Sequence, residues 1–456
     1  MFCKIHFARP VKRKRLFIGK MKGDVLMKKK LPILLCAVLA LFILFGLTEI
    51  TQAEETAWNY KKPFQKRVGA FTYHAYKSKD GKKAWIYKID IKKKKAKTLS
   101  IPSKLKGKKV TRIGYYDKKY KERDYTKNIF GAYVERFHNY YRSAVTNTTI
   151  KKVIIPKSVT VMEATTFCGL TALKSVVIPP KVEELKEETF YGCINLKTVT
   201  LPEKLKYLDP AAFQGCPSLK KMRLSPKNQT YTVRDHCVIA NENQALVYAL
   251  PGNENFQIPE GIKIIKQYAF NNCISRTVNI PASVTEIEGK AFERPLLGQN
   301  EYIKDVTVSA ENQVYARDGR CIYNTAKKSL SVVIARKDKT ILISPQVENL
   351  DNTHSIVNFR GMIYSLEKTV FPKTLKSATD PALTDLGDAK KVYFLGEKPP
   401  EMLNCIPERS PLPIFCRELH VPENSLEVYK NFYKQHDCDV PSEQWFTFRS
   451  EEELDL

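Results

Sequence analysis

The sequence predicts an α/β-type repeat solenoid, in which one short unit of strand and turn is stacked on copies of itself. Three observations support this prediction. A proline is followed eleven residues later by a phenylalanine five times, these prolines recur at spacings of 23 and 22 residues, and apolar residues occupy the same offsets in each unit. A fixed period in the twenties is typical of stacked repeat proteins. The five pairs are Pro156/Phe167, Pro179/Phe190, Pro202/Phe213, Pro259/Phe270 and Pro281/Phe292.

The clearest unit covers residues 173–196 and begins with a short predicted strand. Val176 and Ile178 are two residues apart, so their side chains lie on the same face of that strand. Pro179 has no backbone N–H to donate and therefore ends the strand. The residues that follow, including Phe190, return to the same core. One unit of this length cannot bury that face alone, but a stack of units buries it continuously.

The repeated motif resembles the BspA-like leucine-rich repeats of bacterial surface proteins. Leu-x-x-Leu-x-Leu at a period of about 20 to 29 residues is the general signature. The BspA-like run Ile-Pro-x-x-Val-x-x-Ile-x-x-x-Ala-Phe-x-x-Cys-x-x-Leu is found as IPASVTEIEGKAF over residues 280–292 and as IPEGIKIIKQYAFNNC over residues 258–273. The resemblance covers residues 99–430. It implies a curved stack with short parallel strands on its inner face, and it suggests a role in adhesion.

Two related segments interrupt the period. The interval from Pro202 to Pro259 is too long for two units, and the extra residues begin after LSPKNQTY; a similar segment begins after VSAENQVY. Each contains two short apolar runs around a polar turn, which predicts a β-hairpin. We therefore expect a solenoid over residues 131–349 with hairpin inserts near residues 228–251 and 312–335.

The pattern decays in residues 350–456, which we interpret as degenerate repeats followed by a C-terminal cap. The run ELHVPENSLEVYKNFY at residues 418–433 is similar to the closing element of the family. Such a cap would cover the exposed last rung of the stack. Four residues have the spacing of one face of a short helix: Leu426, Tyr429, Phe432 and Tyr433.

The N-terminal segment predicts export. Residues 27–53 combine a basic start, an apolar run over residues 31–47 and small residues before Glu54, as in a cleavable signal peptide. An uncleaved membrane anchor is the alternative, since the apolar run can just span a bilayer. Residues 1–26 are a basic leader or a mis-annotated start. The expected location is extracellular or at the cell surface, with membrane anchoring if the leader is not cut.

Positive charge is concentrated before the repeats. Residues 54–130 hold 24 Lys and Arg against 7 Asp and Glu, whereas residues 131–456 hold 41 against 39. Alternating apolar and polar residues predict a basic, β-rich N-terminal cap over residues 54–130. Its lysines are either a solvated surface that guards a sheet edge or an anchor for an anionic cell-wall polymer. The export signal argues against nucleic acid as a partner.

Catalytic motifs are absent from the sequence. No His-Glu-x-x-His, Cys-x-x-Cys, Gly-x-Ser-x-Gly or phosphate-binding loop occurs, and the seven histidines are scattered. We therefore predict no enzymatic activity, no cofactor and no metal site. The weakest of three hypotheses is an enzyme using Cys416 and His420. Cys193, Cys216 and Cys273 recur with the period, which favours small buried side chains over ligands.

The predicted binding surface is the concave face of the stack, the side of the strands that points away from the core. Residues on either side of each inward-facing aliphatic should form a parallel array, the surface that repeat proteins usually use for partners. An unidentified protein or glycan is the expected ligand, bound at the cell surface; a scaffold held to anionic wall polymer by the Lys-rich N-terminal region is the alternative. The candidate residues are Lys152, Ile154, Ser175, Val177, Thr198, Thr200, Lys221, Arg223, Thr277, Asn279, Asp305 and Thr307.

Overall fold

The chain divides into two compact units, residues 1–58 and residues 59–456, and the elements below lie in the second unit except that β1 begins at Trp58. The leader at residues 1–26 and the export signal at residues 27–53 lie outside the described residues. The computed structural model describes residues 57–93, 95–115, 125–127, 133–137, 140–143, 149–251, 254–292, 303–351, 355–357, 366–387, 389–403, 418–436 and 447–450.

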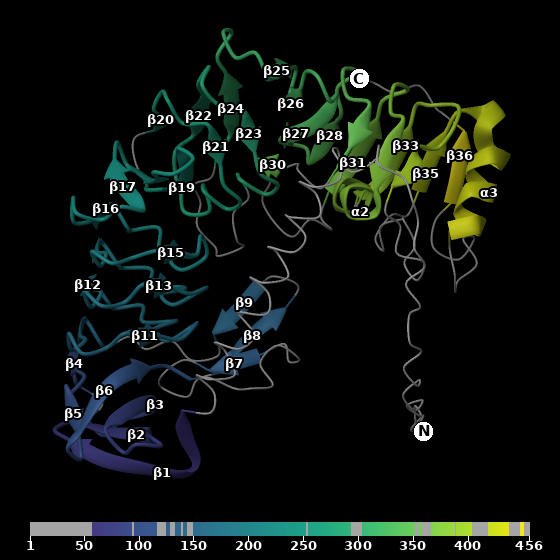
Figure 1. Ribbon diagram of the computed structural model, residues 1–456. Helices are drawn as coiled ribbons and strands as arrows, with labels where there is room; N and C mark the ends of the chain where they lie inside the picture. The colour runs from purple at the N-terminus through teal and green to yellow at the C-terminus, as the bar shows by residue number, and fades with distance from the viewer. Residues whose placement is uncertain are drawn as a thin grey trace, which may run out of the picture. The chain divides into compact units, whose positions relative to one another are not determined.

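A six-stranded sheet forms the N-terminal cap (Figure 1). It comprises β1 (Trp58–Val68), β2 (Phe71–Ser78), β3 (Lys83–Ile91), β5 (Lys104–Leu105), β6 (Lys108–Ile113) and β11 (Val161–Met162). Tyr73, Trp85 and Ile86 are fully buried. Trp85 and Ile86 are consecutive and point to opposite faces of β3, so this part of the sheet is covered on both sides. Because β6 pairs in parallel with β11, the cap sheet continues into the first repeat. A separate antiparallel sheet contains β7 (Tyr125–Lys127), β8 (Tyr133–Phe137) and β9 (Tyr140–Ser143).

Short parallel strands stack the repeats, which confirms the predicted solenoid. The first row is hydrogen-bonded in the order β16-β14-β12-β10-β4, and the central residue of each strand is buried. This row begins at β4, within the segment assigned from sequence to the cap. A second row of two-residue strands lies where the chain returns. The bounds are β4 (Thr98–Ser100), β10 (Lys152–Ile154), β12 (Ser175–Val177), β14 (Thr198–Thr200), β16 (Lys221–Arg223), β13 (Glu184–Leu185) and β15 (Tyr207–Leu208).

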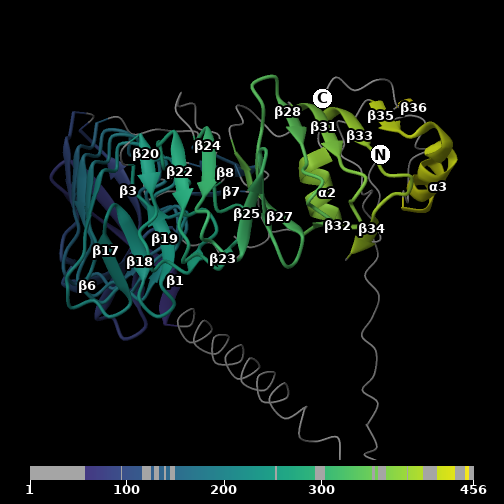
Figure 2. The same ribbon diagram turned by 90° about the horizontal axis from the view of Figure 1, so that it is seen from above.

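The stacking continues where the sequence pattern decays. Strands β20 (Asn255–Gln257), β22 (Thr277–Ile280) and β24 (Asp305–Val308) lie side by side in Figure 2. Five further parallel strands form the last row: β28 (Thr340–Leu342), β31 (Leu366–Phe371), β33 (Ala389–Phe394), β35 (Glu418–Val421) and β36 (Thr447–Ser450). The return strands are β21 (Ile264–Ile265), β23 (Glu286–Ile287), β29 (Asn349–Leu350), β30 (Ser355–Val357), β32 (Ser377–Thr379) and β34 (Glu401–Leu403).

Each of the two interrupting segments forms three antiparallel strands, one more than a hairpin. In the first, the last strand also pairs in parallel with β21 and so replaces a return strand of the stack. The second segment joins β29 and β30 in the same way. The strands are β17 (Tyr231–Arg234), β18 (Cys237–Ala240) and β19 (Ala245–Ala249), then β25 (Tyr315–Asp318), β26 (Cys321–Asn324) and β27 (Ser329–Ile334).

The Asn and Tyr shared by the two segments attach each segment to the preceding repeat. The side-chain amide of Asn228 donates to the carbonyl oxygens of Glu203 and Leu205, and the Leu208 N–H donates to the Tyr231 hydroxyl at 3.0 Å. Asn312 and Tyr315 make the equivalent hydrogen bonds in the second interrupting segment. These bonds satisfy buried backbone groups at the point where the regular repeat stops.

The phenylalanines of the repeat form columns in the core. The rings of Phe167 and Phe190 stack with centroids 5.5 Å apart, and those of Phe190 and Phe213 stack at 5.4 Å. Tyr248, from β19, continues the column against Phe213 at 6.3 Å. The columns continue in the later repeats through Phe270 and Phe292 at 4.8 Å, Phe371 and Phe394 at 4.8 Å, and Phe394 and Tyr429 at 5.5 Å.

Helix is limited to a few short segments in the described part of the chain. These are α2 (Asp380–Gly387), the 3₁₀ turn η3 (Glu423–Ser425) and α3 (Leu426–His436). Tyr429 of α3 is fully buried, and its hydroxyl donates to backbone oxygens of Gly396 and Lys398. Within the described residues, no helix has the length and apolar character needed to cross a membrane.

Candidate binding surface

The twelve residues proposed from the sequence lie on six parallel strands in two rows, and all are exposed or partly exposed. In each strand they flank a buried residue, as Ser175 and Val177 flank Val176. We call the outward residues of β4, β10, β12, β14 and β16 the first face: Thr98, Ser100, Lys152, Ile154, Ser175, Val177, Thr198, Thr200, Lys221 and Arg223. The second face comprises the outward residues of β20, β22 and β24: Asn255, Gln257, Thr277, Asn279, Asp305 and Thr307.

Four members of these faces were not predicted from the sequence. Thr98 and Ser100 belong to β4, which pairs in register with β10, and Asn255 and Gln257 belong to β20. A signal for β20 was available, because NFQIP has the x-apolar-x-Ile-Pro pattern of the other strands. The strand β4 has the same pattern in TLSIP at residues 98–102, but it lacks the phenylalanine eleven residues after its proline, so the Pro/Phe period did not include it.

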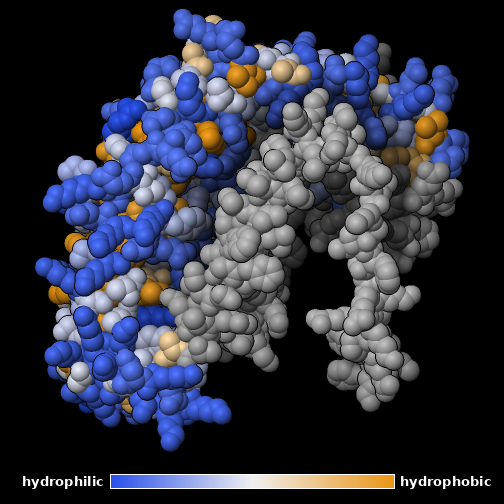
Figure 3. All heavy atoms as spheres, in the orientation of Figure 1, coloured by the Kyte–Doolittle hydropathy of each residue, from blue (hydrophilic) through white to orange (hydrophobic). Residues whose placement is uncertain are grey.

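Parallel register divides the first face into two columns. Lys152 pairs with Thr98 and Ser175, and Thr198 pairs with Lys221. In the second column Ile154 and Val177 are exposed aliphatic residues, with relative accessibilities of 44% and 62%. Hydrophilic residues predominate over this part of the stack in Figure 3, with isolated apolar residues between them. The columns in full are Thr98, Lys152, Ser175, Thr198 and Lys221, and Ser100, Ile154, Val177, Thr200 and Arg223.

The second face differs because its polar groups bond to one another. The Thr277 hydroxyl donates to Asn255 Oδ1 at 2.7 Å, and the Thr307 hydroxyl donates to Asn279 Oδ1 at 2.9 Å. Asp305 forms an ion pair with Arg317 at 3.0 Å. Much of the hydrogen-bonding capacity of this face is therefore already used within the protein. No side-chain hydrogen bond joins the described residues of the first face to one another.

The prolines and phenylalanines proposed as a structural ladder lie inside or at the edge of the core. All five phenylalanines are buried, and each proline follows the strand of its unit. The proline carbonyl accepts the first turn hydrogen bond, as in Val159 N–H to Pro156 and Val182 N–H to Pro179. Pro179, Pro202 and Pro281 are buried.

Cysteine and histidine do not assemble into a reactive site in the described part of the chain. Cys193, Cys216 and Cys273 are buried thiols, and burial raises the pKa of Cys193 well above its ordinary value. His420 is buried, stacks on Tyr393 and lies 3.3 Å from Glu418. No group of three metal-ligating side chains occurs among the residues described. Cys416, the proposed partner of His420, lies outside them, as do Cys405 and Cys438.

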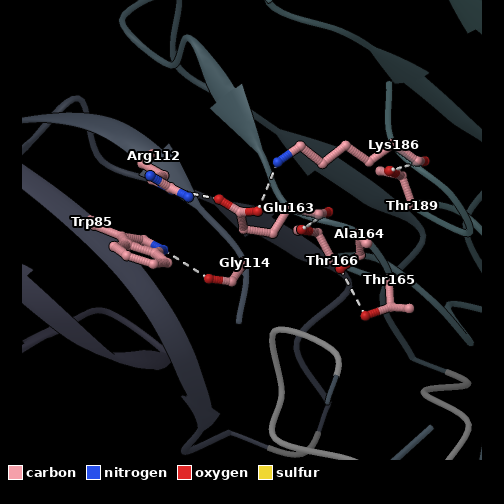
Figure 4. Close-up of polar contacts among 9 residues, drawn as sticks. All are labelled: Trp85, Arg112, Gly114, Glu163, Ala164, Thr165, Thr166, Lys186 and Thr189. Carbon is pink, nitrogen blue, oxygen red and sulfur yellow. Dashed lines mark hydrogen bonds and ion pairs between the residues drawn. The ribbon is translucent and has the colours of Figure 1, made fainter. Parts of the chain in front are cut away.

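A buried ionic cluster joins the cap to the first repeats (Figure 4). Glu163 pairs with Arg112 and, at 3.0 Å, with Lys186. The Arg112 guanidinium lies 4.1 Å from the centroid of the Trp85 ring, and Trp85 Nε1 donates to the Gly114 oxygen at 2.8 Å. Arg112 and Glu163 are almost fully buried. The cluster therefore connects β6, the residue after β11 and the following unit through largely buried side chains.

Similarity to known proteins supports the same interpretation of the repeats. A sequence model described as a BspA type leucine rich repeat region matches residues 139–241 and 245–329, in six copies. No curated protein matches the chain.

Solved structures that match include three bacterial proteins. A leucine rich cell surface protein from Faecalibacterium prausnitzii is 16% identical, with 74% of this chain and 96% of that chain covered and a TM-score of 0.34. A leucine-rich repeat protein from Bacteroides ovatus is 12% identical, with 85% and 100% covered and a TM-score of 0.31. The pneumococcal vaccine antigen PcpA is 13% identical, with 80% and 82% covered and a TM-score of 0.35.

These identities and TM-scores are low, so the assignment rests on the sequence match and on the stacked parallel strands. The match falls on the units whose prolines, phenylalanines and short strands were described above. The repeats in residues 139–241 and 245–329 are therefore leucine-rich repeats of the BspA type.

Proposed function

We propose that this protein is exported and binds a protein or glycan at the bacterial cell surface through the first face, without catalysing a reaction. The observation that supports this most strongly is the composition of that face. Ile154 and Val177 are exposed on the adjacent strands β10 and β12. Lys152 lies on the same strand as Ile154, and Lys221 and Arg223 lie on β16 at the end of the row, beyond β14. An apolar centre with polar residues around it is the usual arrangement of a protein interface. The second face, whose polar groups bond to one another, is a poorer candidate.

The absence of a catalytic arrangement among the described residues agrees with a binding role. The cysteines there are buried, and burial raises the pKa of Cys237 and of Cys321 to about 12, which keeps these thiols protonated and unreactive at neutral pH. The fold alone does not specify the ligand, because one repeat architecture serves many partners.

A second candidate function is a scaffold held to anionic wall polymer by the basic cap. Exposed lysines on β1 and in the loop after β3 favour it, at Lys61, Lys62, Lys92 and Lys93. Such attraction is long-range and is weakened by salt. Binding to purified cell walls that persists at high salt, or no binding at low salt, would count against this scaffold.

The binding function is tested on an array of purified extracellular proteins and polysaccharides with the full-length chain in a non-ionic detergent. The double variant Lys221→Ser/Arg223→Ser should weaken binding to a ligand found this way by about tenfold or more, since losing about 1.4 kcal/mol is tenfold in affinity. Its thermal midpoint should not change, because both side chains are exposed. A matched control, Lys204→Ser/Lys227→Ser, removes the same charge from exposed positions outside the first face.

An independent variant, Ile154→Ser/Val177→Ser, tests the apolar part of the same face. Loss of binding in this variant alone would place the contact on the aliphatic residues. Unchanged binding in both face variants would remove the first face from the site.

A further inference from the structure

A row of five lysines runs along the stack beside the first face. One lysine immediately precedes each strand of the first row, and all five side chains are exposed. Their backbones are hydrogen-bonded from rung to rung: Lys151 N–H donates to Lys97 O at 2.7 Å, and Lys197 N–H donates to Lys174 O at 2.8 Å. Lys174 and Lys220 complete the ladder with bonds of 3.2 Å. We call Lys97, Lys151, Lys174, Lys197 and Lys220 the lysine ladder.

The spacing of the ladder follows from the parallel sheet. Neighbouring strands lie about 4.8 Å apart, so five rungs place five ammonium-bearing side chains along about 19 Å. Lys152, Lys221 and Arg223 of the first face add positive charge beside them. The four-residue segments that contain the ladder and the strands, 97–100, 151–154, 174–177, 197–200 and 220–223, contain no acidic residue.

The later rows provide an internal comparison. At the same position before β20 and β22 stand Glu254 and Arg276, which form an ion pair at 2.8 Å. In the last row Lys390 pairs with Glu367 at 2.9 Å. The ladder lysines form no ion pair with any described residue. Like charges on neighbouring strands destabilise a sheet. In the later rows ion pairs relieve this repulsion at Arg276 and Lys390, whereas the ladder lysines have no such partner among the described residues.

We infer that the lysine ladder binds a linear anionic polysaccharide laid along the stacking axis of the first row. This inference rests on the proposed function and names the class of partner for the same part of the molecule. A regular line of single positive charges matches a polymer with anionic groups at regular intervals. Among the possible polyanions, the composition disfavours nucleic acid: the ladder has lysines where bidentate phosphate contacts favour arginine, and the first face has no aromatic side chain on which bases could stack.

The test uses polygalacturonate, which carries one carboxylate on each sugar, as the probe for the full-length chain. The ladder variant Lys151→Gln/Lys174→Gln/Lys197→Gln removes three central charges. The matched control, Lys157→Gln/Lys181→Gln/Lys204→Gln, removes three exposed lysines that follow the same strands, so both variants have the same net charge. Thermal midpoints show whether each variant is folded.

The ladder variant should lose at least about tenfold in affinity at low salt. The negative slope of log K against log salt should become less steep by about 2, because fewer counterions are released. The control should keep most of its affinity. Affinity should also rise with the length of oligogalacturonates until they span the ladder. Equal losses of affinity in the ladder variant and the control would show that only net charge matters and would overturn the inference. A ladder variant that binds as tightly as the wild type would also overturn it. A single-stranded oligonucleotide that binds more tightly than polygalacturonate of equal charge would assign the ladder to nucleic acid instead.

The outcome is separable from that of the proposed function. If polygalacturonate does not bind while the Ile154→Ser/Val177→Ser variant loses an array ligand, the first face binds a partner and the polysaccharide inference is wrong. If the ladder variant alone loses polygalacturonate and neither face variant changes any binding, the ladder stands and the first face is not the site.

Discussion

At the residue scale, a buried ion-pair cluster joins the cap to the repeats, in addition to the apolar packing between them. Glu163 is accessible to only 3% and has two cationic partners, Arg112 and Lys186. Gly114, which accepts the Trp85 bond, has φ of 107°, and a Cβ there would collide with Thr166 Oγ1. A side chain cannot be placed at this position without moving the first repeat.

Replacing Glu163 with Gln should destabilise the protein by about 3 kcal/mol or more. The change removes the negative charge and leaves Arg112 buried without its counter-ion, a loss that typically costs about 3 to 5 kcal/mol. Urea unfolding followed by tryptophan fluorescence measures it, because Trp85 contacts Arg112. Lys186→Met should cost less, since Lys186 is partly exposed. Equal stability of wild type and Glu163→Gln would contradict a supporting role for the cluster.

Asp209 should make stability depend on pH. Burial raises the pKa of this carboxyl in the folded protein, and Glu187 and Glu184 also raise it. The protonated form is therefore favoured by folding, so this contribution is present below the unfolded pKa of about 3.9 and is lost as pH rises through the higher folded value.

Asp209→Asn should accordingly raise the thermal midpoint at pH 7, with a gain that shrinks towards pH 3. The amide oxygen can still accept from the Ala211 N–H, so the turn is retained. Asp235→Asn, at an exposed carboxyl, is the control. A pH-independent difference between wild type and Asp209→Asn would refute this assignment.

At the element scale, the repeat is held by its phenylalanine columns. Phe190 is fully buried between the rings of Phe167 and Phe213. Each ring fills the space above its neighbour, so the loss of one ring leaves a cavity in the middle of a column.

Phe190→Ala should destabilise the protein by about 3 to 5 kcal/mol, and Phe190→Leu by less, because the cavity is smaller. Chemical denaturation of the two variants measures the difference. Val177→Ala, which shortens an exposed side chain in the same unit, should have almost no effect. Similar losses for Phe190→Ala and Val177→Ala would show that the column is not the main source of stability.

At the scale of the whole molecule, the core of the described residues contains three large apolar clusters. The first includes the insert residue Tyr248, and the next along the chain contains Phe270 and Phe292. Asn272 connects them: its amide donates to Phe213 O at 2.7 Å and its Oδ1 accepts from Cys216 N–H at 3.0 Å. A side chain thus satisfies backbone groups where no regular repeat follows.

Asn272→Ala should therefore separate the unfolding of the two clusters as well as lower stability by about 2 kcal/mol or more. It leaves two buried backbone groups without this partner, and each such group costs about 1 to 3 kcal/mol. Calorimetry should show a broader or split transition, since repeat stacks unfold locally when an interface is weakened. Asn195→Ala removes a similar but exposed bond to Thr171 O and should leave the transition unchanged. A single sharp transition in Asn272→Ala would argue against this coupling.

The sequence by itself determined the stacked repeat, its inward-facing residues and the outward residues of most strands. These follow from local spacing, because alternation along a strand and a proline at its end act within one unit, as with Val176 and Pro179. The hairpin β18–β19 was also predictable from its turn. The pairing of β17 with β18, and of β25 with β26, was not predictable in this way, because β17 and β25 precede the apolar runs that identified the hairpins.

Only the tertiary structure showed which residues distant in sequence are neighbours and which contacts they make. Periodicity could not place β4 beside β10, Tyr248 beside Phe213 or Asn272 beside Cys216, because these contacts join residues far apart in sequence. Four lysines of the ladder recur every 23 residues and follow from the period, but Lys97 joins them only because its carbonyl accepts from Lys151 N–H, 54 positions later in the sequence. The binding properties of a surface charge depend on the charges that lie beside it in space, and the parallel stacking of the strands determines which charges those are.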